Sequence, residues 1–212
     1  MRAPPALPWV VLTDNVADFA DLPVRAVMHT PTGPMAADYV ARLDPTGNSQ
    51  GAAAYHDKRF ALRAALDDFA TAISWTRTRA SPRSRCRPPF HRAWAMNPYV
   101  RRSIAEHLTT CGTWRLPAFQ ELTAELGLPP SALDRAAWCH ETCYAVTRDG
   151  REARFFEAWE RGAALLTERG VFSGEGGVMG LAAEAAGWTV DFDAVAPLFA
   201  AIEHEGGGPK AD

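Results

Sequence analysis

The stretch that decides the fold class is residues 151–169, REARFFEAWERGAALLTER. Phe155, Trp159 and Leu166 fall along one stripe of a helix in this stretch, and Phe156 lies beside them. Gly170 follows at once, where a residue that ends a helix is expected. The stretch therefore predicts an amphipathic helix with one buried face, and the same combination of stripe and stop recurs along the chain.

Five further segments carry a helical pattern. The clearest has Leu62, Leu66, Phe69 and Ile73 at helical spacing. Another opens at Asn97, a good N-cap, and stops at Gly112. With the first stretch, the predicted helices are residues 53–75, 97–112, 117–126, 131–146, 151–169 and 189–203.

The expected fold is mainly α, a helical domain of about six helices behind an irregular, proline-rich region at residues 1–50. Two apolar runs in that region, at 9–12 and 24–28, are candidates for short strands, and Met35, Tyr39 and Leu43 suggest a short helix. The expected divisions are 1–50, a first long helix within 51–80, an Arg/Pro linker at 81–93, the helical domain at 94–203 and a flexible tail at 204–212.

The net charge of −3 hides a segregation of charge along the 212 residues. Only Lys58 and Lys210 among the 22 basic residues are lysines. Between Arg77 and Arg115, nine arginines face a single acid, Glu106, so this segment carries +8 and the remaining chain −11. This pattern disfavours a chain-wide nucleic-acid surface, and it leaves open a solvated linker or a docking segment for an acidic partner.

The sequence points to a cytoplasmic protein without a membrane segment. No apolar run reaches the roughly 20 residues of a membrane span, and the first eleven residues lack the apolar core of a secretory signal. Four cysteines in a chain of this length do not make a disulfide framework, which favours a reduced compartment.

Three local clusters invite a chemical interpretation. Cys139, His140 and Cys143 would share one face of the predicted 131–146 helix, as weak metal or thiol candidates, although the C-x-x-C spacing of a zinc site is missing and buried, packed cysteines are the simpler expectation. His56-Asp57 is expected to cap or solvate the start of a helix. Glycines 174, 176 and 180 follow a helix rather than a strand, so we expect a flexible connection instead of a dinucleotide loop.

Several short motifs between residues 89 and 177 recur in an order that resembles a known family. They are FHRAW at 90–94, CGTW at 111–114, AFQEL at 118–122, RFFEAW at 154–159 and ALLTERGV at 164–171. The layout is similar to the helical domain of nitrile hydratase β subunits and of their small activator proteins. Upstream, YHDK at 55–58 with Phe69 and Trp75 resembles a helix of the related thiocyanate hydrolase β subunit.

The resemblance implies a chain that works as part of a complex of the lyase class. In the family, iron or cobalt lies on an α-type subunit, so this chain would carry no cofactor, and its partner would be that subunit. The family's supporting arginine would fall at Asn97, which leaves Arg59 or Arg101 as possible substitutes for catalytic support. The β-rich domain of a full β subunit is also missing, which favours an accessory (activator) protein.

The resemblance also implies a partner interface made of aromatic and arginine side chains, since such residues anchor interfaces. The expected interface residues are Trp94, Trp114, Phe119, Phe155, Phe156, Trp159, Arg85, Arg87 and Arg92. The alternative is that the aromatic side chains fill the core. Two other functions stay open from the residues alone: a free-standing metal or thiol protein using Cys139, His140 and Cys143, and an Arg-rich nucleic-acid binder.

Overall fold

A computed structural model describes residues 8–30, 56–75, 78–80, 94–96, 101–140, 143–171, 174–195 and 202–204. Helix accounts for 52% of the described residues and strand for 17%, so the fold is mainly α, as predicted. The α-helices are α3 (Lys58–Asp68), α4 (Ile104–Cys111), α5 (Leu116–Glu125), α6 (Ala132–Arg135), α7 (Glu152–Glu168) and α8 (Glu175–Ala185). Among them, no helix has the length and apolar character that a membrane span requires.

Three small sheets accompany the helices. Strands β1 (Trp9–Thr13) and β2 (Val24–Met28) pair in parallel, joined through the 3-10 helix η1 (Val16–Phe19). A four-stranded sheet has the order β3-β6-β5-β7, and β4 pairs with β8. The bounds of these strands are β3 Thr71–Trp75, β4 Thr78–Ala80, β5 Trp94–Met96, β6 Cys143–Thr147, β7 Val190–Asp191 and β8 Ile202–His204.

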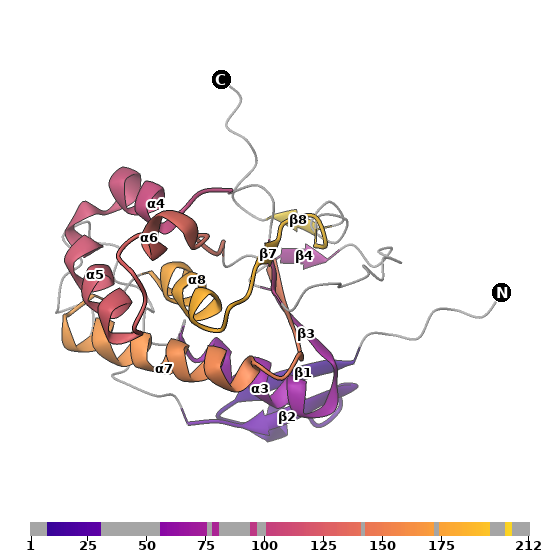
Figure 1. Ribbon diagram of the computed structural model, residues 1–212. Helices are drawn as coiled ribbons and strands as arrows, with labels where there is room; N and C mark the ends of the chain where they lie inside the picture. Colours follow the sequence, from indigo (N-terminus) through magenta and orange to yellow (C-terminus); the bar gives the residue numbers. More distant parts are fainter. Residues whose placement is uncertain are drawn as a thin grey trace.

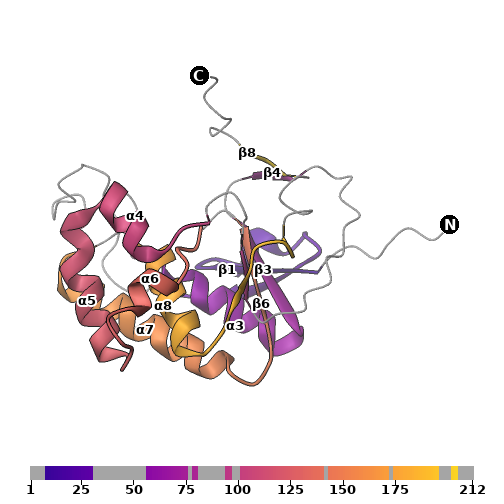
Figure 2. The same cartoon turned by 45° about the horizontal axis from the view of Figure 1, so that its top comes forward.

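Most of the helices lie on one side of the molecule and most of the strands on the other (Figure 1). Helices α4 to α8 gather on one side, whereas α3 lies with β1, β2 and β3 on the other, and the turned view shows the same division (Figure 2). One apolar cluster nevertheless extends across both sides, from Leu62 and Leu66 of α3 to Phe155 and Trp159 of α7. The boundary between the two sides is therefore part of the core.

Two predicted helices match the structure closely. Segment 117–126 is α5 and segment 151–169 is α7, and both are followed by a glycine in the left-handed region, Gly127 at φ 68° and Gly170 at φ 66°. The two predicted strands in the first thirty residues are β1 and β2. The helix suggested for Met35 to Leu43, the linker at 81–93 and residues 205–212 of the tail lie outside the described residues.

The predicted 53–75 helix is too long, because α3 ends at Asp68. Phe69 is already extended, with φ −123° and ψ 149°, and the next residues form β3. Thr71 and Ile73 are β-branched, and they pair with Thr147 and Ala145 of β6. Pairing with a distant strand therefore overrides the helical spacing of Phe69 and Ile73.

Three more predicted helices are wrong in extent or in type. The 97–112 helix begins at Ile104 rather than Asn97, because Ser103 and Glu106 form a capping box there. The 131–146 helix stops at Arg135, and its second half contains β6, whose first four residues are all buried. The 189–203 segment contains strands β7 and β8, with residues 196–201 outside the description.

Helix α8 overturns the expectation of a flexible connection at the glycine string. Ten of its residues are buried, and its small side chains let neighbouring segments approach closely. A Cβ atom on Gly180 would lie 2.1 Å from the carbonyl oxygen of Ala137, and one on Gly177 would lie 2.5 Å from the Phe119 ring. These glycines are therefore required by packing, and α8 is the helix around which α7 and the Ala137 segment assemble.

We predict that Gly180→Ala lowers the free energy of unfolding by about 3 kcal/mol, because the added methyl group meets backbone that cannot move away cheaply. At an exposed helical site the same change would raise stability by about 1 kcal/mol. Urea denaturation measures the difference. Ala183→Gly in the same helix is the control and is expected to cost about 2 kcal/mol, from helix propensity and the loss of a buried methyl group. A stability of Gly180→Ala equal to or above wild type would contradict the packing.

Candidate functional site

Buried and partly buried polar side chains gather at the amino-terminal end of α3, in a group that we call the α3 cluster. Its residues come from the end of β2, from α3 and the residues just before it, from α7 and from the first residue of α8. Buried ionisable groups are costly unless they are paired, and they concentrate at functional sites. The members of the α3 cluster are His29, His56, Asp57, Lys58, Arg59, Trp159 and Glu175.

His56 connects α3 to the helical side of the molecule. The indole Nε1–H of Trp159 donates to His56 Nδ1 at 3.0 Å, and Arg59 Nη1 donates to the His56 carbonyl oxygen at 2.8 Å. Burial, followed by the positive charge of Arg59, lowers the pKa of His56 to about 4. His56 is therefore neutral near pH 7, and its proton lies on Nε2 because Nδ1 accepts a hydrogen bond.

Asp57 lies between two basic side chains. Its carboxylate is 3.1 Å from Nε2 of His29 and 3.5 Å from Nη1 of Arg59. The guanidinium of Arg59 also stacks over the Phe60 ring, 4.1 Å from its centroid, and burial lowers the Arg59 pKa. Of the expected roles, Asp57 does occupy the N-cap position of α3, although its side chain makes no capping hydrogen bond. The expectation of a solvated helix start at His56-Asp57 is wrong, because both residues are at most 9% exposed and bind partners within the fold.

Lys58 and Glu175 form the second connection between α3 and the helical side. Lys58 Nζ donates to Glu175 Oε1 at 2.6 Å. The Glu175 side chain is only 3% exposed, whereas that of Lys58 is 18% exposed. Glu175 is the first residue of α8, where a carboxylate also complements the positive end of the helix dipole. The pair therefore places a buried carboxylate inside the fold and a partly accessible ammonium beside it.

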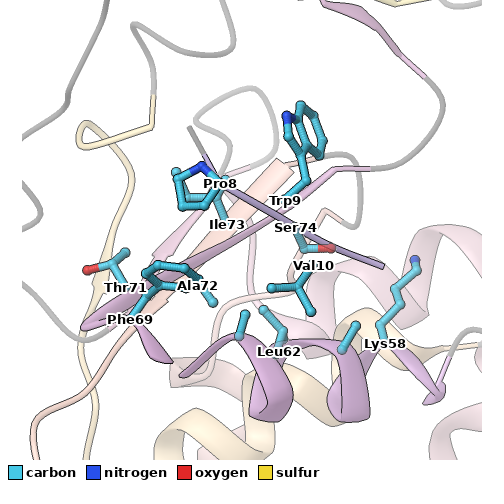
Figure 3. A pocket seen from close by; sticks show the side chains of 12 residues that line it. Pro8, Trp9, Val10, Lys58, Leu62, Phe69, Thr71, Ala72, Ile73 and Ser74 are labelled. Atoms are coloured by element: carbon cyan, nitrogen blue, oxygen red, sulfur yellow. The ribbon is translucent and has the colours of Figure 1, made fainter. Parts of the chain in front are cut away.

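A pocket of about 440 Å³ adjoins this ion pair. Figure 3 shows α3 on one side of it, β1 and β3 on the others, and Lys58 at one end. Most of the lining side chains are apolar, and Lys58 carries the only formal charge among them. The lining residues are Pro8, Trp9, Val10, Lys58, Ala61, Leu62, Ala65, Phe69, Thr71, Ala72, Ile73 and Ser74.

The pocket is bordered by the edge of β3. Four consecutive residues of β3, Thr71 to Ser74, line it, although side chains alternate between the faces of a strand. Arg148 N–H donates to the Ala70 carbonyl, and β3 is antiparallel to β6 in the register Thr71 to Thr147. Every second residue, which includes Thr71 and Ile73, therefore directs its N–H and C=O away from β6. These backbone groups lie on the side of β3 that is not paired with β6.

A second buried histidine lies on the helical side of the molecule. The His107 ring stacks on Trp138 with centroids 3.4 Å apart, and the Arg115 guanidinium lies 5.5 Å from the Trp138 ring centroid. Burial, followed by the charge of Arg102, lowers the pKa of His107 to about 4. This cluster is tightly packed and lies among α4, the 3-10 helix η2 (Thr113–Arg115) and the segment after α6.

The proposed cysteine site does not assemble as predicted. Cys139 and Cys143 do not share a helix face, because Cys143 opens β6 and Cys139 precedes it in non-helical chain. Burial raises the pKa of the Cys143 thiol to about 12, so it does not ionise near neutral pH. Across the part of the chain that the structure describes, no group of three His, Cys, Asp or Glu side chains, including His140, could hold a metal ion.

The predicted partner-facing aromatic side chains are mostly inside the fold. Phe119, Phe155 and Trp159 are 0% exposed and Phe156 is 5% exposed. They fill the core, so the prediction that they present a surface is wrong, and Trp114 is the one partly buried ring among those described. Side chains of Trp94, Arg85, Arg87 and Arg92 lie outside the description.

The two arginines considered for catalytic support differ in their surroundings. Arg59 is 7% exposed and belongs to the α3 cluster. Arg101 is exposed, lies near the Phe192 ring and pairs with Asp193 at the surface. The structure therefore brings Arg59 together with other buried ionisable groups and leaves Arg101 outside that cluster.

Comparison with known proteins adds no relative: no family model, curated protein or solved structure matches this chain. The pocket and the α3 cluster are therefore the features of the molecule that bear on its function. Sequence reasoning overlooked Glu175, Trp9 and the edge of β3 as parts of a site. Lys58 offered the one local signal, as one of only two lysines in an arginine-rich chain.

The buried state of His56 predicts how stability depends on pH. Its pKa is about 6.5 in the unfolded chain and is lowered to about 4 by burial in the folded protein. The unfolded state therefore binds the proton more strongly, so the stabilisation is complete above the unfolded pKa and is lost as the pH falls toward 4. Near pH 5 the loss from His56 is about 2 kcal/mol.

His56→Asn isolates this contribution, because the asparagine oxygen can accept the Trp159 hydrogen bond but does not titrate. We expect the free energy of unfolding of wild type to fall more than that of His56→Asn, by about 2 kcal/mol, between about pH 7.5 and pH 5. Urea denaturation at the two pH values provides the test. His107 contributes equally to the pH dependence of both proteins. If the free energy of unfolding fell by the same amount in both, His56 would take up its proton as readily in the folded protein as in the unfolded chain, which would contradict the prediction.

Proposed function

We propose that this chain is a binding protein for a small, mainly apolar molecule that occupies the pocket between β1, α3 and β3. The observation that carries the proposal is the pocket itself, about 440 Å³ in volume and lined mostly by apolar side chains. Pockets that hold small ligands are of this size and combine an apolar lining with a few polar groups. Lys58, Thr71 and Ser74 are the polar residues of the lining (Figure 3).

The position of the pocket supports the proposal. Its walls belong to β1 and β3, which are members of different sheets, and its floor is α3. Trp9 lines the pocket and is 49% exposed, so it contributes an aromatic ring to the lining. The α3 cluster holds the floor in place through Trp159 and Glu175, so the pocket is formed before a ligand arrives.

We predict that Ala61→Phe blocks the pocket and weakens the binding of 1-octanol at least about tenfold, because the added ring takes the space that the ligand needs. Isothermal titration calorimetry measures the affinity. Ala64→Phe is the matched control: Ala64 has similar exposure on the same helix but does not line the pocket.

Equal effects of the two substitutions on 1-octanol binding would contradict the proposed pocket. Circular dichroism of both variants must show an unchanged helix content, so that a loss of binding is not a loss of fold. Octanol that binds to neither wild type nor control would also count against a site for apolar molecules.

A second candidate function follows from the resemblance to nitrile hydratase β subunits and activators. In this proposal the chain is an accessory protein that completes a metal-bearing α-type subunit, and the iron or cobalt belongs to that partner. The observation in its favour is that Trp9, Leu22 and Met28 of the β1–β2 unit are 49%, 52% and 63% exposed. Trp and Met are enriched in interfaces between proteins.

Co-expression with an α-type subunit, followed by affinity purification, tests this second function. We expect the two chains to co-purify and the metal content of the α-type subunit to rise. Trp9→Ala combined with Met28→Ala should reduce the recovered partner several-fold if the β1–β2 unit is the docking surface. No co-purification together with unchanged metal loading would exclude the accessory function.

A further inference from the structure

We infer that the ligand of the pocket is a carboxylic acid with an apolar body, whose carboxylate binds Lys58 at the end of the pocket beside Glu175. This inference rests on the proposed function and adds the chemical class of the ligand. It is carried by the placement of one ammonium group in an otherwise apolar lining (Figure 3).

The accessible charge at the pocket is positive. Lys58 lines the pocket, whereas its partner Glu175 does not and is 3% exposed. A ligand therefore meets the ammonium of Lys58 before it meets the carboxylate of Glu175. An ammonium has three N–H donors, so a ligand carboxylate can bind the same nitrogen as Glu175 Oε1, which lies 2.6 Å from Lys58 Nζ.

The apolar surroundings of Lys58 favour a ligand whose head group carries a negative charge. An amine would bring a second positive charge next to Lys58, in a site where screening by water is weak. A neutral alcohol would fill the apolar part but would make only an ordinary hydrogen bond at the end. Charge-assisted hydrogen bonds are about twice as strong as neutral ones, so a carboxylate gains most from this arrangement.

Glu175 and the ligand carboxylate are expected to compete for Lys58. Both are anions directed at one nitrogen, and repulsion between them lowers the affinity of the ligand. Neutralising Glu175 should therefore strengthen carboxylate binding while leaving the binding of a neutral ligand unchanged. A purely structural role of the ion pair gives no reason for the two ligand types to respond differently.

The experiment compares octanoate with 1-octanol, two ligands with the same chain and different head groups, by calorimetry near neutral pH. Wild type should bind octanoate about tenfold more tightly than octanol. Glu175→Gln, which keeps an oxygen acceptor for Lys58, should strengthen octanoate binding by about a further tenfold and leave octanol binding unchanged. The double variant Lys58→Met with Glu175→Gln should lose the preference for octanoate, and it avoids a buried carboxylate without its cation.

Arg63→Met is the matched control, because it removes one positive charge from the exposed side of the same helix without touching the pocket. It should retain the octanoate preference of wild type. Equal affinities of wild type for the two ligands, or a preference that survives in the double variant, would overturn the inference while leaving the apolar pocket intact. Binding of neither ligand to wild type would overturn the pocket as well.

Discussion

The ion pair between Lys58 and Glu175 is the contact on which the arrangement of this molecule depends. It joins residues that are 117 positions apart and connects the first turn of α3 to the first residue of α8. The hydrogen bond from Trp159 to His56 lies beside it and connects the same end of α3 to α7. The Trp159–His56 hydrogen bond is buried and the Glu175 carboxylate is 3% exposed, so breaking either contact leaves a buried polar group without this partner, which makes the position of α3 well defined.

That position gives the pocket its floor and its one charged group. Helix α8 can offer Glu175 at this point because its glycines allow Ala137 and Phe119 to pack against it closely, so the helical side of the molecule supports the site from behind. On the opposite side, the edge of β3 and the first residues of β1 provide the walls. Lys58 therefore belongs both to the network that holds α3 in place and to the lining of the pocket.

The sequence predicts a helix well when only one of its faces is buried. It does not predict a helix that is buried on nearly all sides. Helix α7 alternates buried and exposed faces, so its stripe is visible in the sequence, whereas α8 is buried on nearly all sides and has no stripe to detect. The first four residues of β6 are all buried, and the alternation that identifies a strand is absent there. The site was harder still, because the partners of Lys58 and His56 lie more than a hundred positions away along the chain.

The most direct test of the account is a crystal structure of the protein with a terminally brominated octanoate, in which anomalous scattering locates the bromine. We expect the bromine between α3 and the walls formed by β1 and β3, and the carboxylate within hydrogen-bonding distance of Lys58 Nζ. A fully occupied ligand bound elsewhere, or one in the pocket with its carboxylate directed away from Lys58, would contradict the account.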